Sequence, residues 1–162
     1  MADKAQAMAN ITAYWNTLSP TYDDAPDHRV RSETEQQGWL ETLGSLLPPA
    51  PAQVLDLGTG TGFLALLLAE LGHRVIGVDI AADMLAVARE KAAGLASPPV
   101  AAGSADAIVS RHLLWTLPDP LGALQNWYHA LRPGGRLVVI DGLWALGAEP
   151  DAAPPADDPY TT

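Results

Sequence analysis

The chain has 162 residues, of which 48% are hydrophobic and 17% charged, and this composition is that of one globular domain rather than of a disordered segment. Its 9 Lys and Arg against 19 Asp and Glu give a formal net charge of −10, so its surface repels nucleic-acid phosphates and anionic lipid head groups. The absence of Cys excludes disulfides, Cys-based zinc sites, Fe–S clusters and thiol nucleophiles. We therefore expect no nucleic-acid partner, no membrane partner and no metal site.

The N-terminal segment, residues 1–47, is polar and acidic with scattered aromatic side chains. It lacks the apolar core of a signal peptide, and the longest apolar run of the chain, residues 63–69, is far shorter than the roughly 20 residues of a membrane-spanning helix. Trp39, Leu43 and the leucines after them recur at three- and four-residue steps, which predicts a helix over 34–47. We expect residues 1–47 to form a helical cap of a cytoplasmic protein.

The central segment, residues 48–145, alternates short β-branched runs with helical patterns. Strands are predicted over 54–57, 74–79, 106–110 and 136–141, and helices over 63–71, 83–93 and 121–131. This alternation is typical of an α/β protein with a doubly wound, mostly parallel sheet, the Rossmann-like fold, with helices on both faces. Right-handed crossovers place the carboxyl ends of all strands along one edge, where ligands bind in such sheets.

A glycine-rich turn, D-L-G-T-G-T-G over residues 56–62, joins the first predicted strand to a helix. Gly58 and Gly60 allow backbone angles and a close approach that a Cβ would block. We expect free N–H groups at the start of the helix to favour an anionic or electron-rich ligand, and Asp56 to order the loop through its backbone N–H groups. Asp79 ends the next strand, close to where nucleotide sites of this architecture hold ribose hydroxyls. The third glycine of a dinucleotide site is missing, and there is no P-loop.

The pattern D-x-G-x-G-x-G resembles motif I of the class I S-adenosylmethionine-dependent methyltransferases. Residues 77–85, GVDIAADML, are similar to the family's acidic ribose loop, and residues 106–120, DAIVSRHLLWTLPDP, to its fourth strand and the loop that follows. Residues 131–141, LRPGGRLVVID, are similar to its fifth strand. The resemblance covers about residues 10–145 and is greatest to the small-molecule branch, which includes quinone-precursor and natural-product enzymes. It implies S-adenosylmethionine as cofactor and methyl transfer to an O, N or C atom of a small molecule.

The resemblance implies that two segments contact the methionine moiety of the cofactor. In the glycine turn these residues are Gly58, Thr59 and Gly60. After the third predicted strand, the backbone near Ser110 and Arg111 would face the methionine end.

Other residues would hold the nucleoside or close over it. Asp79 would bind both ribose hydroxyls, and Ile80 and Met84 would sandwich the adenine. In relatives with a similar Tyr-Asp segment the N-terminal aromatics cover the cofactor, which points to Tyr14 and Tyr22. For Met84 and the two tyrosines, plain packing on the core is an equally good interpretation.

Four histidines are candidates for a general base. His112 follows the third predicted strand at the ligand edge of the sheet and is the best of them. His28 would line a substrate mouth, whereas His73 and His129 are expected to be solvated. Methyl transfer depends mostly on proximity and alignment, so His112 shaping the pocket without acting as a base is the alternative.

Two parts of the family's sheet have no counterpart in this sequence. The family normally has a further strand, ending in an acidic loop, where residues 94–105 leave no room for one. No strand is predicted after residue 141, and residues 146–162, rich in Pro and acidic side chains, are expected to form a loop or tail. A sheet without these strands would have unpaired edges, for which there are three candidate explanations: residues omitted after Val100, a truncation of the chain, or a partner that completes the sheet. Omitted residues would predict a chain gap before Ala101 and a protein mass above 17.0 kDa.

Two other functions stay open. A nicotinamide oxidoreductase is disfavoured by the missing third glycine and by the lack of a Tyr-x-x-x-Lys pair. A cofactor-binding but inactive homologue, with a regulatory or scaffolding role, would carry the same motifs. The expected protein is a cytoplasmic enzyme with a small-molecule substrate, and a candidate homo-oligomer.

Overall fold

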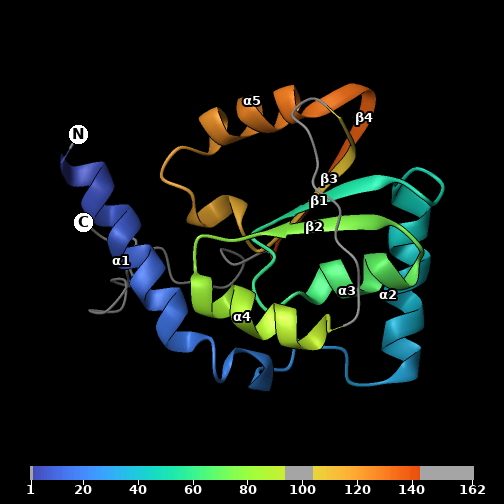
Figure 1. The fold of residues 1–162 in the computed structure, drawn as a ribbon, viewed down its shortest axis with the longest axis horizontal. Helices are drawn as coiled ribbons and strands as arrows, with labels where there is room; N and C mark the ends of the chain where they lie inside the picture. The colour runs from blue at the N-terminus through green and yellow to red at the C-terminus, as the bar shows by residue number, and fades with distance from the viewer. Residues whose placement is uncertain (1, 94–103, 143–162) are drawn as a thin grey trace.

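A parallel four-stranded sheet forms the centre of the computed structural model, which describes residues 2–93 and 104–142 (Figure 1). The strands lie in the order β2-β1-β3-β4, and each pairs in parallel with its neighbour. Their bounds are Gln53–Leu57 for β1, Arg74–Val78 for β2, Ala105–Arg111 for β3 and Leu131–Ile140 for β4. The predicted parallel α/β architecture is confirmed.

Five α-helices and two short 3-10 helices accompany the sheet in the described part of the chain. They are α1 (Ala2–Leu18), η1 (Tyr22–Asp24), α2 (Glu33–Leu46), α3 (Phe63–Glu70), α4 (Ala82–Lys91), η2 (Leu114–Thr116) and α5 (Pro120–Ala130). Local sequence explains two of the starts: the Ser32 side chain accepts a hydrogen bond from the Glu35 N–H at the start of α2, and Asp119 caps α5 ahead of Pro120.

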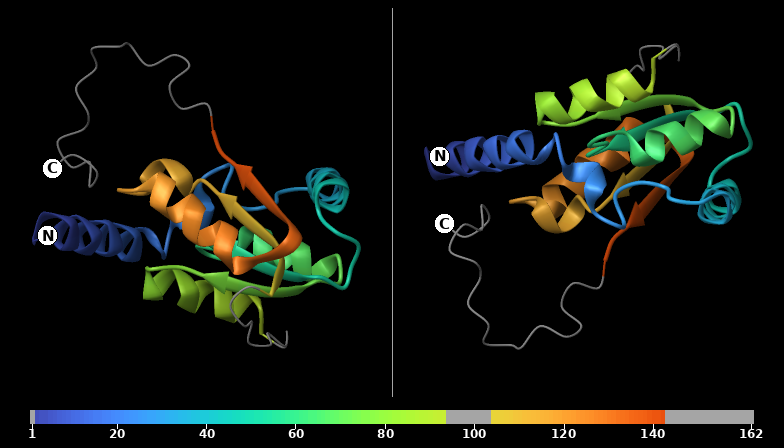
Figure 2. Two further views of the ribbon diagram at one scale, coloured as in Figure 1. Left: turned by 90° about the horizontal axis from the view of Figure 1, so that it is seen from above. Right: turned by 90° about the horizontal axis from the view of Figure 1, so that it is seen from below.

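The main core lies between the sheet and two helices, α2 and α3. Leu43 of α2 and Leu68 of α3 are completely buried against Val54 of β1 and Val109 of β3. Helix α5 lies on the opposite side of the sheet, so the sheet is doubly wound as predicted (Figures 1 and 2). The cover on that side is thin, because α5 has no buried residue and Tyr128 is 74% exposed.

The N-terminal helix is packed separately from α2. Helix α1 contacts α4 near the carboxyl edge of the sheet, and the Asp83 N–H of α4 donates to Asn16 Oδ1 of α1 at 3.0 Å (Figure 2). Helix α2 instead belongs to the main core through Leu43. No helix in the described ranges is long and apolar enough to cross a membrane.

The structure refines one predicted boundary. The last strand is predicted to begin at Arg136, but β4 begins at Leu131, which pairs with Ala105 before a register shift. Regular pairing starts at Arg136, opposite Ala107. The expected chain gap between Val100 and Ala101 and the expected tail over 146–162 both lie outside the described residues.

Candidate functional site

The glycine turn after β1 is held by hydrogen bonds within the protein. Gly58 and Gly60 both have positive φ, +69° and +54°, a backbone region that favours glycine. The N–H groups of Gly58 and Thr59 donate to the carbonyl oxygen of Val78, at 2.8 and 3.1 Å. A Cβ on Gly58 would lie 2.9 Å from Leu113 Cδ1. These two N–H groups therefore tie the turn to the end of β2. The prediction of free N–H groups concerns the start of α3, a few residues further on, and stays a prediction.

Asp56 lies beneath the turn and is 1% exposed. Its Oδ2 accepts a hydrogen bond from the Thr59 hydroxyl at 2.7 Å, and its carboxylate also accepts one from the Ala65 backbone. Burial raises the pKa of Asp56 to about 6, although both hydrogen bonds oppose that rise. Asp56 thus orders the turn through the Thr59 hydroxyl rather than, as was predicted, through the loop's own backbone N–H groups, and its backbone donor Ala65 lies in α3.

Asp79 connects the two loops at the ends of β1 and β2. Its Oδ2 accepts from the Gly60 N–H and its Oδ1 from the Ala81 N–H, both at 2.9 Å. A carboxylate has about four lone-pair positions, so these two bonds fix its orientation and leave capacity for hydroxyl donors. Since β1 and β2 are adjacent and parallel, the glycine turn and Asp79 come together at the ligand edge of the sheet.

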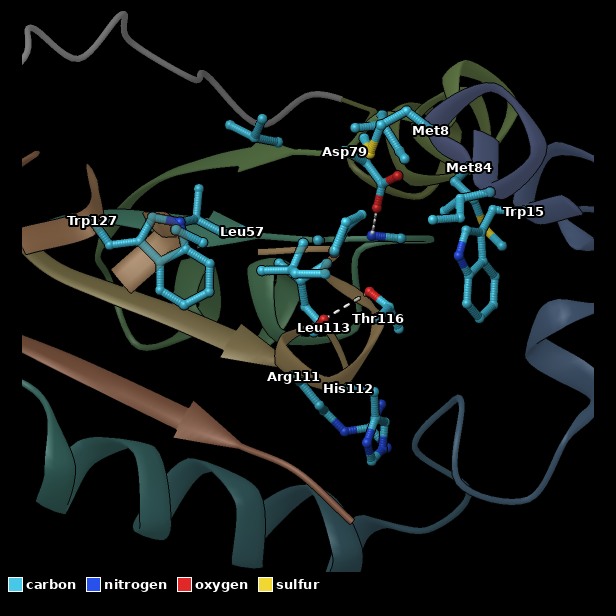
Figure 3. A pocket seen from close by; sticks show the side chains of 18 of the residues that line it. Met8, Trp15, Leu57, Asp79, Met84, Arg111, His112, Leu113, Thr116 and Trp127 are labelled. Carbon is cyan, nitrogen blue, oxygen red and sulfur yellow. Dashed lines mark hydrogen bonds between the residues drawn. The ribbon is translucent and has the colours of Figure 1, made fainter. Parts of the chain in front are cut away.

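A cavity of about 230 Å³ opens at this edge (Figure 3). Its floor is made by the ends of β1, β2 and β3, and its walls by α1, η2 and α5. Eight of the eleven residues predicted for the site line it: Tyr22, Gly58, Gly60, Asp79, Ile80, Met84, Arg111 and His112. Met84 is 2% exposed, so it both packs and lines the cavity.

Three predicted site residues do not line the cavity. Tyr14 is 36% exposed, and its ring packs edge-on against Trp15, which does line the cavity. Thr59 is buried, and its hydroxyl donates to Asp56 beneath the turn. Ser110 is completely buried in the middle of the sheet, and no described residue hydrogen-bonds its hydroxyl.

Much of the cavity wall consists of apolar residues that sequence reasoning missed. One face of α1 contributes Met8, Ile11 and Trp15. Their spacing of three and four residues is the pattern of one helix face. This spacing is the sequence signal that could have indicated an apolar wall formed by α1. Leu117, Trp127 and their neighbours close the opposite wall. No local pattern indicates which face of α5 turns toward the cavity.

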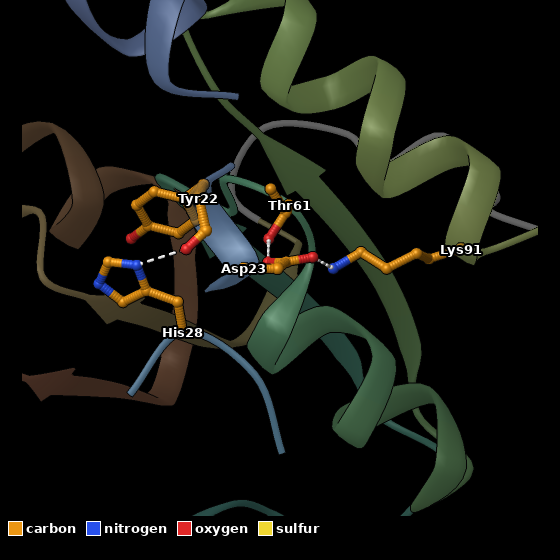
Figure 4. A network of polar contacts seen from close by, with 5 residues as sticks. All are labelled: Tyr22, Asp23, His28, Thr61 and Lys91. Atoms are coloured by element: carbon orange, nitrogen blue, oxygen red, sulfur yellow. Dashed lines mark hydrogen bonds and ion pairs between the residues drawn. The ribbon is translucent and has the colours of Figure 1, made fainter. Parts of the chain in front are cut away.

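The segment after α1 is anchored to the glycine turn by Asp23 (Figure 4). Asp23 Oδ1 accepts from the Thr61 hydroxyl at 2.6 Å, and its Oδ2 pairs with Lys91 Nζ of α4 at 2.7 Å. The preceding residue, Tyr22, stacks on the His28 ring with 3.9 Å between ring centroids. Burial raises the pKa of Tyr22. These contacts place the Tyr22 ring over Gly60, with Cε1 4.0 Å from a Cβ built there.

Arg111 holds the same segment from the other side. Its guanidinium lies over the Phe63 ring, 4.2 Å from the centroid, and donates to the carbonyl oxygen of Asp27. The prediction concerned only the backbone at this position, whereas the side chain also lines the cavity and links β3 to the loop before α2.

The four histidines differ in their surroundings. His112 lines the cavity, and His28 lies behind Tyr22. His129 is exposed, as predicted. The expectation that His73 is solvated is wrong: it is 8% exposed, and burial lowers its pKa.

Comparison with known proteins identifies the family. Residues 55–139 match the family model described as "Methyltransferase domain". The chain is 41% identical over 141 residues to a demethylmenaquinone methyltransferase of Thermus thermophilus, covering 78% of this chain and 63% of that protein. It is 32% identical over 151 residues to a ubiquinone biosynthesis O-methyltransferase of Xanthomonas axonopodis pv. citri, covering 85% of this chain and 58% of that protein.

A solved structure shows the same fold. The phosphoethanolamine N-methyltransferase 2 of Haemonchus contortus, in complex with S-adenosylhomocysteine, is 25% identical with a TM-score of 0.64, covering 82% of this chain and 34% of that chain. The chain therefore belongs to the class I S-adenosylmethionine-dependent methyltransferase family, as the sequence motifs predicted. It spans about 60% of the length of the curated relatives it matches.

Proposed function

We propose that this protein binds S-adenosylmethionine and transfers its methyl group to a small molecule. The observation that carries the proposal is the meeting of Gly58, Gly60 and Asp79 in one cavity, which is lined on its other sides by apolar residues. A turn that presents no side chain at Gly58 and Gly60, next to a fixed carboxylate, fits a ligand that combines a diol with an extended chain. Membership of the methyltransferase family supports this choice of ligand.

The residues around Asp79 fit the nucleoside end of this cofactor. Asp79, already oriented by two backbone N–H groups, would accept hydrogen bonds from the ribose hydroxyls. Ile80 and Met84, which line the cavity beside it, would pack on the adenine.

The glycine turn and the end of β3 would hold the methionine end. Gly58 and Gly60 allow close approach, and Thr59 keeps the turn in place through Asp56. Ser110 and Arg111 would contribute backbone groups at the end of β3. When bound, S-adenosylmethionine supplies an electrophilic methyl group on a sulfonium.

Aromatic side chains of the N-terminal segment would cover the cofactor. Tyr22 already lies over Gly60 and is the better placed of the two predicted tyrosines. Trp15 lines the cavity where Tyr14 was predicted to do so, and we assign that part of the cover to Trp15.

The acceptor would be a small, largely apolar ring compound, quinone-like in its chemistry. The apolar faces of α1 and α5 support this assignment, because they offer Met8, Ile11 and Trp127 as packing surfaces. The names of the Thermus and Xanthomonas relatives point to the same class. His112 is the candidate general base. The net charge of −10 argues against nucleic-acid and membrane partners, and the lack of Cys fits a cytoplasmic enzyme. A homo-oligomer would cover the exposed apolar residues of β4.

Calorimetric titration tests the cofactor assignment directly. S-adenosylhomocysteine should bind and NADH should not. Asp79→Ala should weaken binding of S-adenosylhomocysteine by about 1–3 kcal/mol, the usual cost of losing hydrogen bonds to a charged group. The exposed carboxylate variant Glu41→Gln is the matched control and should bind like the wild type. Binding of NADH in preference, or undiminished affinity of Asp79→Ala, would contradict the assignment, and binding without transfer to any acceptor would favour an inactive homologue.

A further inference from the structure

His112 and Asp141 stand side by side at the carboxyl ends of two neighbouring strands. His112 is the residue after β3 and Asp141 the residue after β4. The His112 N–H donates to the carbonyl oxygen of Ile140 at 3.0 Å, which continues the strand pairing by one residue. His112 Nδ1 then lies 3.6 Å from Asp141 Oδ1. The backbone of the sheet, rather than a loop, sets the position of this pair.

His112 is held in an unusual backbone conformation. Its φ is +55°, and within residues 2–93 and 104–142 it is the only residue other than glycine with a positive φ. Such a conformation costs free energy and persists where the surrounding structure imposes it, which is common at active sites. His112 adopts this conformation at the point where β3 reaches the cavity (Figure 3).

The surroundings favour the uncharged form of the His112 imidazole. Burial and then the charge of Arg111 lower the pKa of His112; Asp141 raises it, and His28 lowers it. The side chains of the pair are only 18% and 24% exposed. Among the groups that shift its pKa, Asp141 alone favours the protonated ring. An imidazole whose neutral form is favoured and which has a carboxylate beside it is suited to receive a proton.

We propose that His112 and Asp141 act together on a hydroxyl acceptor, with His112 as the base and Asp141 as the positioning residue. The inference rests on the proposed methyl transfer and names its acceptor atom. With the Nδ1–H directed at Asp141, Nε2 is on the side of the ring that points away from the carboxylate. The acceptor O–H would donate to Nε2.

The step balances as a single displacement. The acceptor oxygen forms a bond to the methyl carbon, the carbon–sulfur bond breaks, and its electron pair leaves the sulfur as a neutral thioether. The hydroxyl proton passes to His112 Nε2, and Asp141 offsets the positive charge that forms on the ring. A base at the reacting atom serves a hydroxyl best, because a neutral amine can attack before it loses its proton.

Nuclear magnetic resonance of the imidazole rings tests the pair without any turnover. In the wild type, ¹H–¹⁵N spectra should show His112 as the Nδ1–H tautomer, with His112→Gln identifying its signals among the four histidines. Asp141→Asn should lower the pKa of His112 further, because it removes the one charge that raises it. Glu41→Gln, which changes an exposed carboxylate on α2, should leave both the tautomer and the pKa unchanged. A wild-type Nε2–H tautomer, or no response to Asp141→Asn, would overturn the pairing.

Turnover and product analysis test the acceptor. Hydroquinone- and catechol-type phenols would be offered beside anilines with the same rings, and the products identified by mass spectrometry. We expect aryl methyl ethers, a fall in kcat of about 10²–10⁴ in His112→Ala, and a fall of about 10- to 100-fold in Asp141→Asn. The acid limb of the kcat profile should move to lower pH in Asp141→Asn, and Asp141→Glu should recover part of the rate.

The affinity for S-adenosylhomocysteine separates the two proposals. If the wild type does not bind it, the proposed function itself fails. If the wild type binds it with unchanged affinity in Asp141→Asn, but methylates only anilines or ring carbons, or transfers to no phenol, the hydroxyl assignment alone fails. An unchanged rate and pH profile in Asp141→Asn would overturn the role of Asp141.

Discussion

The glycine turn and the N-terminal cover meet across the same cavity but are held in place by different interactions. The turn is bonded to the end of an adjacent strand mainly by backbone groups, since the N–H groups of Gly58 and Thr59 donate to the Val78 carbonyl oxygen. The Gly60 N–H adds one bond to a side chain, the Asp79 carboxylate. The cover, formed by α1 and η1, depends on side chains, chiefly Asp23. Backbone bonds between neighbouring strands cannot be removed by exchanging one surface side chain. Changes in the turn should therefore abolish binding, whereas changes in the cover should only weaken it.

The largest effect is expected at Gly58. Gly58→Ala places a Cβ 2.9 Å from Leu113 Cδ1, at a residue whose φ is +69°. The turn must shift to relieve both the contact and the strain, so affinity for S-adenosylhomocysteine should fall about 100-fold or more, and the protein should lose about 1–3 kcal/mol of stability. Calorimetry and urea denaturation measure the two effects.

Gly44→Ala is the matched control. Gly44 lies in α2, and a Cβ there meets nothing within 4 Å. This variant should bind normally and be at least as stable as the wild type, because alanine is the better helix former. Equal affinity of the two alanine variants would contradict the idea that the turn is rigid.

Asp56 should give the turn a characteristic dependence on pH. Its pKa rises from 3.8 to about 6 on folding, so between these values the native state binds more protons than the unfolded state. The free energy of unfolding therefore falls as pH rises through this window, by about 2 kcal/mol between pH 4.5 and 7.5 for this group. Asp56→Asn should remove that contribution, so the difference in stability between wild type and variant should change by this amount over the same range.

Urea denaturation at both pH values measures the Asp56 contribution. Glu41→Gln, an exposed carboxylate variant, should follow the wild type in parallel. If the curves of Asp56→Asn and the wild type stay parallel from pH 4.5 to 7.5, Asp56 does not titrate as its burial requires.

The smallest effect is expected in the cover. Asp23→Asn keeps an oxygen for the Thr61 hydroxyl but loses the charge that pairs with Lys91. The pair is partly exposed, at 26% and 32%, so its contribution is limited to about 0.3–1 kcal/mol. Affinity for S-adenosylhomocysteine should fall about two- to fivefold.

A double-mutant cycle tests whether Asp23 and Lys91 act as one anchor. Lys91→Gln should have an effect similar to that of Asp23→Asn, and the double variant should be little weaker than either single one. Additive losses would show that the two residues act independently.

The sequence by itself determined the strand-turn-helix unit and the family. Gly58, Gly60 and Asp79 could be recognised because their roles depend on backbone angles and on position at a strand end, which are local properties. The carboxyl edge of the sheet followed from the order of the elements. His112 could be placed at that edge for the same reason, although its partner could not.

Only the tertiary structure decided which side chains reach the cavity. Tyr14 and Trp15 are adjacent in sequence, and the packing of α1 against α4 turns Trp15 inward. Ser110 is buried because its strand lies between β1 and β4, which no local pattern shows. His112 meets Asp141 because the register of β3 with β4 sets Arg111 opposite Ile140. Side-chain direction and strand register depend on contacts between segments distant in the chain, so local residue patterns do not fix them.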